Sequence, residues 1–458
     1  MRFLKLILLW AIVIAVVGGG AAWFLAGREA GPTITIGSPQ KYVGRATAFS
    51  ATVESPTPVT APEIAIEQNG QTMTVTPEKV DWTGTERVAV SGTLGRSAQP
   101  ALANGPARII ITARREVMFG LRQAANTVTQ DVEVRLDPPR VAVISLHHFI
   151  NAGGAEFVVM RATPPDVEAG IQVGDARYRT YPGSAVGIAD PAIRVGFFAW
   201  RHDQDAKTRL MAYARDAAGN EVTTPFDYKP FPKRFLDSKI PIDQRFLDRV
   251  VPAIASHTPD LKIDTGSPEG LLKGFLEING NLRRNNNATI AALAEKSAPK
   301  MLWSDAFAPM GNAQVESRFA DRRTYFHDDK EIDRQVHLGF DLASLQQAPV
   351  LASNAGTVVY ADYLGIYGNC VIVDHGMGVQ TLYAHLSTMN VKTGDTVGKG
   401  HELGRTGATG LAGGDHLHFT VLLQGTPVNP VEWWDGHWME DRVFRKIREA
   451  GGQAPHSK

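Results

Sequence analysis

The sequence predicts a mainly β protein with an N-terminal transmembrane helix, two β-sandwich domains, a short helical linker and a C-terminal antiparallel-β domain. Three observations support this. One long apolar run lies at the N-terminus. Short alternating runs separated by turn residues fill most of the chain. Only one stretch has helical spacing of its apolar residues. We divide the 458 residues into 1–30, 31–137, 138–230, 231–302, 303–440 and a flexible tail, 441–458.

The N-terminal run predicts a membrane anchor. No charged residue occurs from Leu6 to Ala26, a stretch of 21 residues, and about 20 suffice to cross a bilayer. Arg2 and Lys5 precede it, so positive charge is expected to stay in the cytoplasm and the rest of the chain outside. The alternative is a cleaved signal peptide that ends near Gly20–Ala22. Both interpretations predict export.

Charge balance and cysteine content limit the partners and the kinds of site that this chain can have. Lysines plus arginines equal aspartates plus glutamates, 47 each, which argues against a nucleic-acid partner. Cys370 is the single cysteine, so neither an internal disulfide nor a thiolate-rich zinc site can form. Because Cys370 lies in an apolar run, we expect a core residue rather than a catalytic thiol.

Two stretches upstream of the linker read as sandwiches. In both, short strand-like runs alternate with Gly, Pro, Asn and Ser clusters, and Pro138-Pro139 separates them. The second stretch ends in a strand at 210–215 and a Gly219-Asn220 turn, which resembles the last hairpin of bacterial immunoglobulin-like domains. We therefore expect immunoglobulin-like sandwiches at 31–137 and 138–230.

The linker carries the helical signal. Residues 241–254 and 269–278 have apolar residues at helical spacing, and Asp243 lies near the start of the first stretch, as helix N-termini prefer. We expect core or docking surface from the stripe formed by Phe246, Leu247, Val250 and Val251.

The first histidine segment is the His-x-Gly-x-Asp run at 337–341. Read with period two, His337, Gly339 and Asp341 share one face of a strand, and Leu338 and Phe340 share the other. This predicts a single strand with a buried apolar face. Gly339 would leave room beside the imidazole and the carboxylate.

Two further segments add imidazoles. His385 lies in a Tyr-Ala-His-Leu run, and His416 and His418 alternate with Leu417 and Phe419. Two imidazoles on one strand face are poor core residues, because both need polar partners. A metal or a catalytic site would supply those partners. The alternative is a set of surface histidines that meet by chance.

Nitrogen and carboxylate ligands without cysteine suit Zn²⁺. A catalytic zinc site needs three protein ligands and one open position. Two histidines and one aspartate would supply the ligands, and two histidines would remain for acid–base chemistry. Spacing alone leaves open which of His416 and His418 binds the metal.

Residues from about Phe307 to Trp434 resemble the lysostaphin/LytM family of zinc metallopeptidases. The motifs include Phe319–Arg323, the 337–341 run, Gly368-Asn369, and the segments around His385 and His418. The resemblance implies zinc ligands His337, Asp341 and His418, and a catalytic pair, His385 and His416. The departure is Gly413–Asp415, an insertion-like approach to His416 that leaves the ligands intact.

The resemblance implies a function. We expect a zinc-dependent endopeptidase with one catalytic ion that hydrolyses peptide bonds in peptidoglycan stem peptides or cross-links. It would be anchored in the inner membrane, with its catalytic domain in the periplasm or cell envelope.

The alternative is a regulatory protein that activates other hydrolases. Relatives of that kind have lost metal ligands, whereas no ligand is missing here. The upstream segments would space the catalytic domain from the membrane or cover its groove. Surface or turn positions without a metal are expected for the other histidines, namely His147, His148, His202, His257, His327, His375, His401, His437 and His456.

Overall fold

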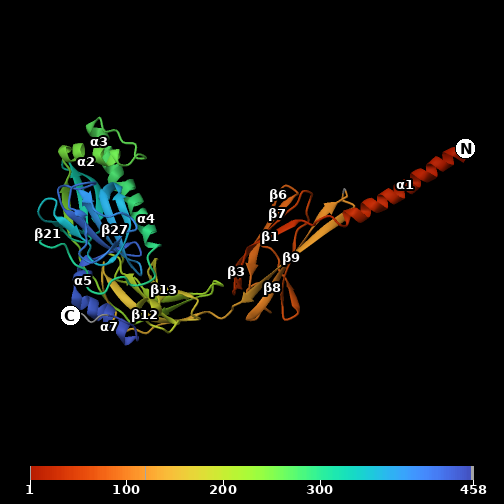
Figure 1. The fold of residues 1–458 in the computed structure, drawn as a ribbon, viewed down its shortest axis with the longest axis horizontal. Coiled ribbons are helices and arrows are strands. Elements are labelled where there is room, and N and C mark those ends of the chain that lie inside the picture. Colours follow the sequence, from red (N-terminus) through yellow and green to blue (C-terminus); the bar gives the residue numbers. More distant parts are fainter. Residues whose placement is uncertain (1, 119, 455–458) are drawn as a thin grey trace. The chain divides into compact units, whose positions relative to one another are not determined.

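The computed structural model describes residues 2–118 and 120–454 (Figure 1). Strands hold 42% of the residues and helices 20%, which confirms the mainly β prediction. The chain forms two compact units. Unit 1 contains residues 1–139 and 215–222, and unit 2 contains residues 140–214 and 223–458.

Unit 1 begins with a long helix, α1 (Arg2–Ala26). Its segment Leu6–Ala26 is long and apolar enough to cross a membrane. Residues 6–25 are exposed, and Ala26 is buried. Two sheets follow, in the strand orders β1-β3-β7-β6 and β2-β9-β8-β4-β5. Their strands are β1 (Thr33–Ser38), β2 (Tyr42–Val43), β3 (Thr47–Glu54), β4 (Glu63–Gln68), β5 (Gln71–Thr74), β6 (Lys79–Thr83), β7 (Arg87–Leu94), β8 (Gly105–Val117) and β9 (Arg122–Val134).

The two sheets of unit 1 share one hydrophobic core. Side chains alternate along a strand, so Phe49 and Val53 of β3 and Ile109 and Ile111 of β8 point to the same interior. The first predicted sandwich thus has two sheets over a common core. Its immunoglobulin-like topology remains a prediction.

Unit 2 begins with further short strands in three sheets. Their orders are β10-β12-β16-β15, β14-β13-β17-β18 and the parallel pair β11-β19. The strands are β10 (Arg140–Val143), β11 (Phe149–Asn151), β12 (Ala155–Thr163), β13 (Glu168–Val173), β14 (Ala176–Arg179), β15 (Tyr181–Pro182), β16 (Ile193–Ala199), β17 (Leu210–Arg215), β18 (Glu221–Pro225) and β19 (Lys229–Phe231).

The linker contains more helix than the sequence predicts. The expected helices are α2 (Gln244–Ser256) and α3 (Pro268–Glu277), and the Asp243 carboxylate accepts a hydrogen bond from the backbone N–H of Phe246 at the start of α2. A π-helical turn, η2 (Ile278–Leu282), then leads into α4 (Arg283–Ala294), which the analysis of apolar spacing missed. The preceding strand is β20 (Asp237–Pro241).

The C-terminal part is built on a large sheet with the order β21-β24-β32-β28-β27-β26-β30, extended by β33 on β32. Smaller sheets have the orders β20-β22-β23 and β25-β31-β29. Ile290 of α4 packs against Cys370, Ile372 and Leu382, so α4 covers one face of the large sheet (Figure 1). The strands are β21 (Gln314–Ser317), β22 (Asp321–His327), β23 (Lys330–His337), β24 (Phe340–Ala343), β25 (Pro349–Leu351), β26 (Gly356–Tyr363), β27 (Asn369–Gly376), β28 (Val379–Leu386), β29 (Thr388–Met389), β30 (Thr396–Val397), β31 (Glu402–Arg405), β32 (Leu417–Leu423) and β33 (Thr426–Val428).

The predicted flexible tail, 441–458, is wrong for its first half. The chain continues as α5 (Pro430–Trp434), α6 (Gly436–Met439), the π-turn η4 (Glu440–Phe444) and α7 (Arg445–Glu449). Val443, Phe444 and Ile447 are buried. Their apolar side chains supply the burial that a flexible tail lacks. Residues 455–458 lie outside the described residues.

The second predicted sandwich packs directly against the C-terminal part. Residues 140–214 belong to the same compact unit as residues 223–458. The rings of Phe197 and Trp433 lie 5.2 Å apart, and the Glu432 carboxylate accepts hydrogen bonds from Asn151 Nδ2 and the backbone N–H of Ala155, each at 2.8 Å. This region therefore packs against α5, the helix that follows the strands of the C-terminal part.

Candidate active site

The large sheet brings a carboxylate and an imidazole together. β24 and β32 are antiparallel neighbours, and Asp341 lies opposite His418 in their register. Asp341 Oδ1 is 2.9 Å from His418 Nδ1. The apolar partners Phe340, Leu417 and Phe419 are buried, as the alternation predicts.

The prediction of a single strand over 337–341 is wrong. His337 ends β23, which belongs to the sheet of β20 and β22, whereas Asp341 lies on β24 of the large sheet. The chain crosses between the sheets at Leu338 and Gly339. A Cβ at Gly339 would lie 2.6 Å from His418 Cε1. The ring of His418 therefore occupies the space that a side chain at position 339 would need.

Three electron-pair donors converge at this crossing. His337 Nε2 lies 2.9 Å from Asp341 Oδ1 and 3.0 Å from His418 Nδ1. His337 Nδ1 lies 3.2 Å from the Arg318 carbonyl, which can only accept, so Nδ1 carries the proton. The Thr420 hydroxyl donates to the Leu338 carbonyl and accepts from His418 Nε2.

Both rings therefore turn unprotonated nitrogens toward one carboxylate oxygen. Three lone pairs at these distances repel one another unless a cation lies between them. The ligand atoms of His337, Asp341 and His418 all fall within 4.8 Å of one another. Tetrahedral zinc holds its ligand atoms about 3.3–3.5 Å apart, so a small outward shift admits the ion. The donor set fits zinc.

Neighbouring groups hold the carboxylate in its ionised form. Burial alone would raise the pKa of Asp341, but the surrounding imidazoles, His337 first, outweigh it and hold that pKa well below its usual range. Arg323 Nη2 donates to Asp341 Oδ2 at 2.8 Å. This contact occupies the second carboxylate oxygen and leaves Oδ1 for a metal.

His385 and His416 lie beside the three converging atoms. His385 Nδ1 donates to the Thr409 carbonyl at 2.8 Å, and His416 Nδ1 donates to the Gly414 carbonyl at 2.9 Å. Each ring therefore has Nε2 free to exchange a proton. The ring centroids lie 4.8 Å apart, and His416 Nε2 is 3.5 Å from Asp341 Oδ1.

The two rings differ in basicity. Burial, together with the neighbouring His416 and His418, holds the pKa of His385 well below its usual range. Burial also acts against the charged form of His416, but the nearby Asp341 carboxylate outweighs it and raises the pKa of His416. The arrangement offers one neutral and one more basic imidazole on the same wall.

The backbone of His385 is unusual. Its φ is 63°, in the left-handed region, which few residues other than glycine adopt. Such conformations persist where the surrounding structure imposes them, and they cluster at functional sites. The bend interrupts the alternation of β28 at the histidine, so strand periodicity could not show which way this ring points.

One cavity of about 120 Å³ joins all five predicted site residues. It is also lined by Arg323, from the Phe319–Arg323 motif, and by residues outside the motifs named from sequence, among them Arg283, Tyr367 and Leu411. Arg283 comes from α4, far from the histidine motifs in sequence. The one signal for Arg283 as a cavity residue is its charge next to a π-helical turn, and the sequence does not predict that turn.

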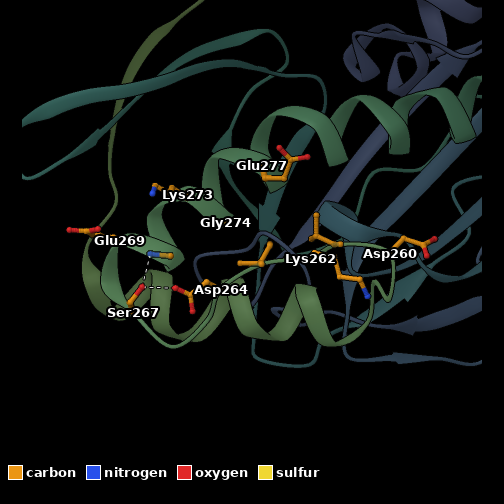
Figure 2. A pocket seen from close by; sticks show the side chains of 11 residues that line it. Asp260, Lys262, Asp264, Ser267, Glu269, Lys273, Gly274 and Glu277 are labelled. Carbon is orange, nitrogen blue, oxygen red and sulfur yellow. Dashed lines mark hydrogen bonds between the residues drawn. The ribbon is translucent and has the colours of Figure 1, made fainter.

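A larger hollow lies away from the histidines. Figure 2 shows this space of about 550 Å³, between the 260–264 segment and α3. The Asp264 carboxylate already accepts hydrogen bonds from the Ser267 hydroxyl and the Gly266 N–H, at 2.7 and 2.9 Å. These contacts close the turn before α3, and we assign the hollow no function.

The remaining predictions about histidine and cysteine are mixed. Cys370 is fully buried in β27, as expected. His375 is also fully buried, between the Ala355 carbonyl and the Thr381 hydroxyl, at 2.7 Å each, so its expected turn position is wrong. His148 is likewise buried, where a surface position was expected. Neither histidine belongs to the group of converging ligand atoms.

Comparison with known proteins points to the same region. Residues 335–430 match the model of peptidase family M23. DD-carboxypeptidase/endopeptidase Mpg of Neisseria meningitidis is 43% identical over 97 residues, which are 21% of this chain and 22% of that protein. Peptidoglycan DD-endopeptidase ShyA of Vibrio cholerae is 35% identical over 121 residues, 26% of this chain and 27% of that protein.

Among solved structures, the catalytic domain of lysostaphin from Staphylococcus simulans is 25% identical. The match covers 31% of this chain and 96% of that domain, with a TM-score of 0.21. The matched part of this chain spans only about a quarter of the length of the two curated relatives.

Proposed function

We propose that this chain, whose residues 335–430 form a peptidase family M23 domain, is a zinc-dependent endopeptidase that hydrolyses peptide bonds in peptidoglycan stem peptides or cross-links. One observation carries the proposal. Three unprotonated donor atoms, from His337, Asp341 and His418, converge within 4.8 Å next to two further imidazoles. Without a cation, the three lone pairs would repel one another.

His337 Nε2, Asp341 Oδ1 and His418 Nδ1 are the proposed zinc ligands. Their other polar atoms are already bound, to the Arg318 carbonyl, Arg323 and Thr420. Such outer contacts fix the tautomer and orientation of a ligand. When bound, zinc supplies a Lewis acid that lowers the pKa of a water and polarises the scissile carbonyl.

His385 and His416 are the proposed catalytic pair. Nε2 of one ring accepts the proton of the attacking water, and Nε2 of the other donates to the oxyanion or the leaving amine. Their Nδ1 contacts with the Thr409 and Gly414 carbonyls hold both rings toward the cavity. Spacing and geometry leave the division of roles between them open.

Peptidoglycan is the proposed substrate because relatives that share the domain are named DD-endopeptidases. The apolar segment of α1 fits an inner-membrane anchor that leaves the catalytic domain in the periplasm, although a signal sequence has the same composition. The two strand-rich regions upstream, which we propose to be immunoglobulin-like, would then lie between the membrane and the wall.

The test is digestion of purified sacculi by the detergent-solubilised full chain loaded with zinc. We expect new peptide ends among the muropeptides, identified by mass spectrometry. H337A should abolish them, whereas H401A should not, because His401 is exposed and lies outside the cavity. Failure of a preparation with one zinc per chain to cleave any wall peptide would refute the proposal.

A further inference from the structure

A guanidinium group from outside the M23 match lines the catalytic cavity. Arg283 begins α4, ahead of the matched residues 335–430, yet it lines the same cavity as His337, His385 and His418. Its side chain is half-buried. A positive group held at a metal site weakens cation binding, so its presence there calls for an explanation.

Arg283 is held in place by a relay of hydrogen bonds. Its Nε donates to the Asn279 carbonyl at 3.2 Å, and its Nη2 donates to Asn279 Oδ1 at 2.6 Å. The fully buried Asn279 in turn donates through Nδ2 to Asp333 Oδ2 at 2.7 Å. Asp333 lies on β23, the strand that ends in His337. The guanidinium is thereby tied to the strand that carries a proposed zinc ligand.

A π-helical turn makes this relay. Asn279 lies in η2, between α3 and α4, and π-turns inside helices are frequent at functional sites. Only two of the five N–H groups of Arg283 have a protein acceptor in the described part of the chain, and no carboxylate there pairs with it. The remaining N–H groups can bind an anion that enters the cavity.

The charges of the cavity lining favour an anionic ligand. Besides Arg283 it contains Arg323, whose Nη2 is bound to Asp341. Asp341 is the single carboxylate among the lining residues, and a bound divalent cation would more than neutralise it.

We propose that Arg283 determines specificity by binding a free carboxylate next to the scissile amide of the substrate. This inference rests on the proposed function. A cross-link made through the side-chain amine of meso-diaminopimelate carries a free carboxylate on the carbon attached to the scissile nitrogen. A planar guanidinium binds such a carboxylate through two parallel hydrogen bonds. The amidated form of the same cross-link cannot make the ion pair.

The experiment compares two cross-linked peptides, one with that carboxylate free and one with it as a carboxamide. The zinc-loaded full chain should favour the free acid by about tenfold or more in kcat/KM, the size expected for a hydrogen bond to a charged group. R283M should reduce the preference to near one, mainly by losing activity on the free acid, and R283K should keep part of it. R284M is the matched control, because Arg284 is exposed and lies outside the cavity.

Other outcomes would overturn the inference. Wild-type protein without preference, or R283M with the preference intact, removes the role of Arg283. Faster cleavage of both peptides by R283M would instead make Arg283 part of a cover over the groove. Equal loss on both peptides would give it a structural role.

Binding separates this inference from the proposed function. Should the wild type cleave neither peptide, the proposed function fails, and calorimetric binding of the two peptides to the zinc-loaded chain still tests Arg283. The free acid should then bind about tenfold tighter to the wild type and equally to R283M. Equal binding of both peptides to the wild type would contradict the inference.

Discussion

At the scale of single residues, the site depends on contacts one step away from the proposed ligands. Arg323 donates to Asp341 and to the Ser317 hydroxyl, both at 2.8 Å. It therefore fixes the carboxylate rotamer that presents Oδ1 to the two imidazoles. Contacts of this kind preorganise a metal site before the ion arrives.

R323M should weaken zinc binding by about 10- to 100-fold, because Asp341 loses the group that orients it. Competition with a chromogenic chelator measures the affinity. R322M is the control, since the neighbouring Arg322 is exposed. Equal zinc affinities of R323M and R322M would show that Asp341 needs no such orientation.

Gly339 is the second test at this scale. An added Cβ would lie 2.6 Å from both His418 Cε1 and Thr420 Oγ1, so G339A should push His418 away from Asp341. We expect a destabilisation of about 1–3 kcal/mol and a loss of zinc binding. G398A, which meets nothing within 4 Å, should change neither. Normal zinc binding by G339A would place the metal elsewhere.

At the scale of elements, alternation predicted the strand of His418 well because β32 is buried along its whole length. It failed at 337–341, where a glycine lets the chain change sheets. It gave no prediction for the ring of His385, where the backbone is left-handed. Period two assumes an uninterrupted pleat. The pleat is interrupted next to His337 and at His385, so the types of these site residues could be predicted but not their geometry.

The helices divide in the same way. α2 was predictable because it has an N-cap residue and a continuous buried stripe. α4 begins with two arginines and three asparagines and buries only Asn286, Ile290 and Ala294, so its apolar signal is weak. Its position depends on tertiary contacts, such as the bond from the Ile366 N–H to Asn286 Oδ1 at 3.0 Å. Arg283 could therefore not be placed from sequence.

The N-cap of α2 gives a prediction at this scale. D243A should lower the free energy of unfolding by about 1 kcal/mol, because the Phe246 N–H loses its acceptor. D243N should retain most of the stability, since asparagine caps about as well as aspartate. Thermal denaturation of the two variants measures the difference. Equal destabilisation by both substitutions would assign the effect to charge.

At the scale of the whole molecule, buried ionisable groups tie the second strand-rich region to the C-terminal helices within unit 2. Lys446 Nζ lies 2.9 Å from Glu156 Oε1, and both side chains are almost fully buried. Glu432 accepts hydrogen bonds from Asn151 and Ala155 nearby. The sequence analysis placed these residues in separate domains, because a contact between residues far apart in the chain produces no local sequence pattern.

Glu432 makes the stability of unit 2 depend on pH. Burial raises its pKa from 4.5 to about 7, although hydrogen bonds from Asn151 and Ala155 oppose the rise. The folded state thus keeps a proton on Glu432 that the unfolded state releases. The contribution of Glu432 to stability is therefore greatest below about pH 4.5 and is lost as pH rises through about 7. The loss is on the order of 3 kcal/mol, at about 1.4 kcal/mol per pKa unit.

Urea denaturation between pH 5 and 8 tests this dependence. E432Q should flatten the fall in unfolding free energy, whereas E295Q, at an exposed glutamate paired with Arg179, should leave the slope unchanged. A slope in E432Q equal to that of the wild type would exclude Glu432 as its source.

Anomalous diffraction at the zinc edge, from crystals of the full chain grown with zinc, tests the metal centre most directly. We expect one strong peak in the M23 domain, bonded to His337 Nε2, Asp341 Oδ1 and His418 Nδ1, with a fourth position left to solvent. A zinc peak bound by other residues, with these three atoms still in contact with one another, would contradict the account.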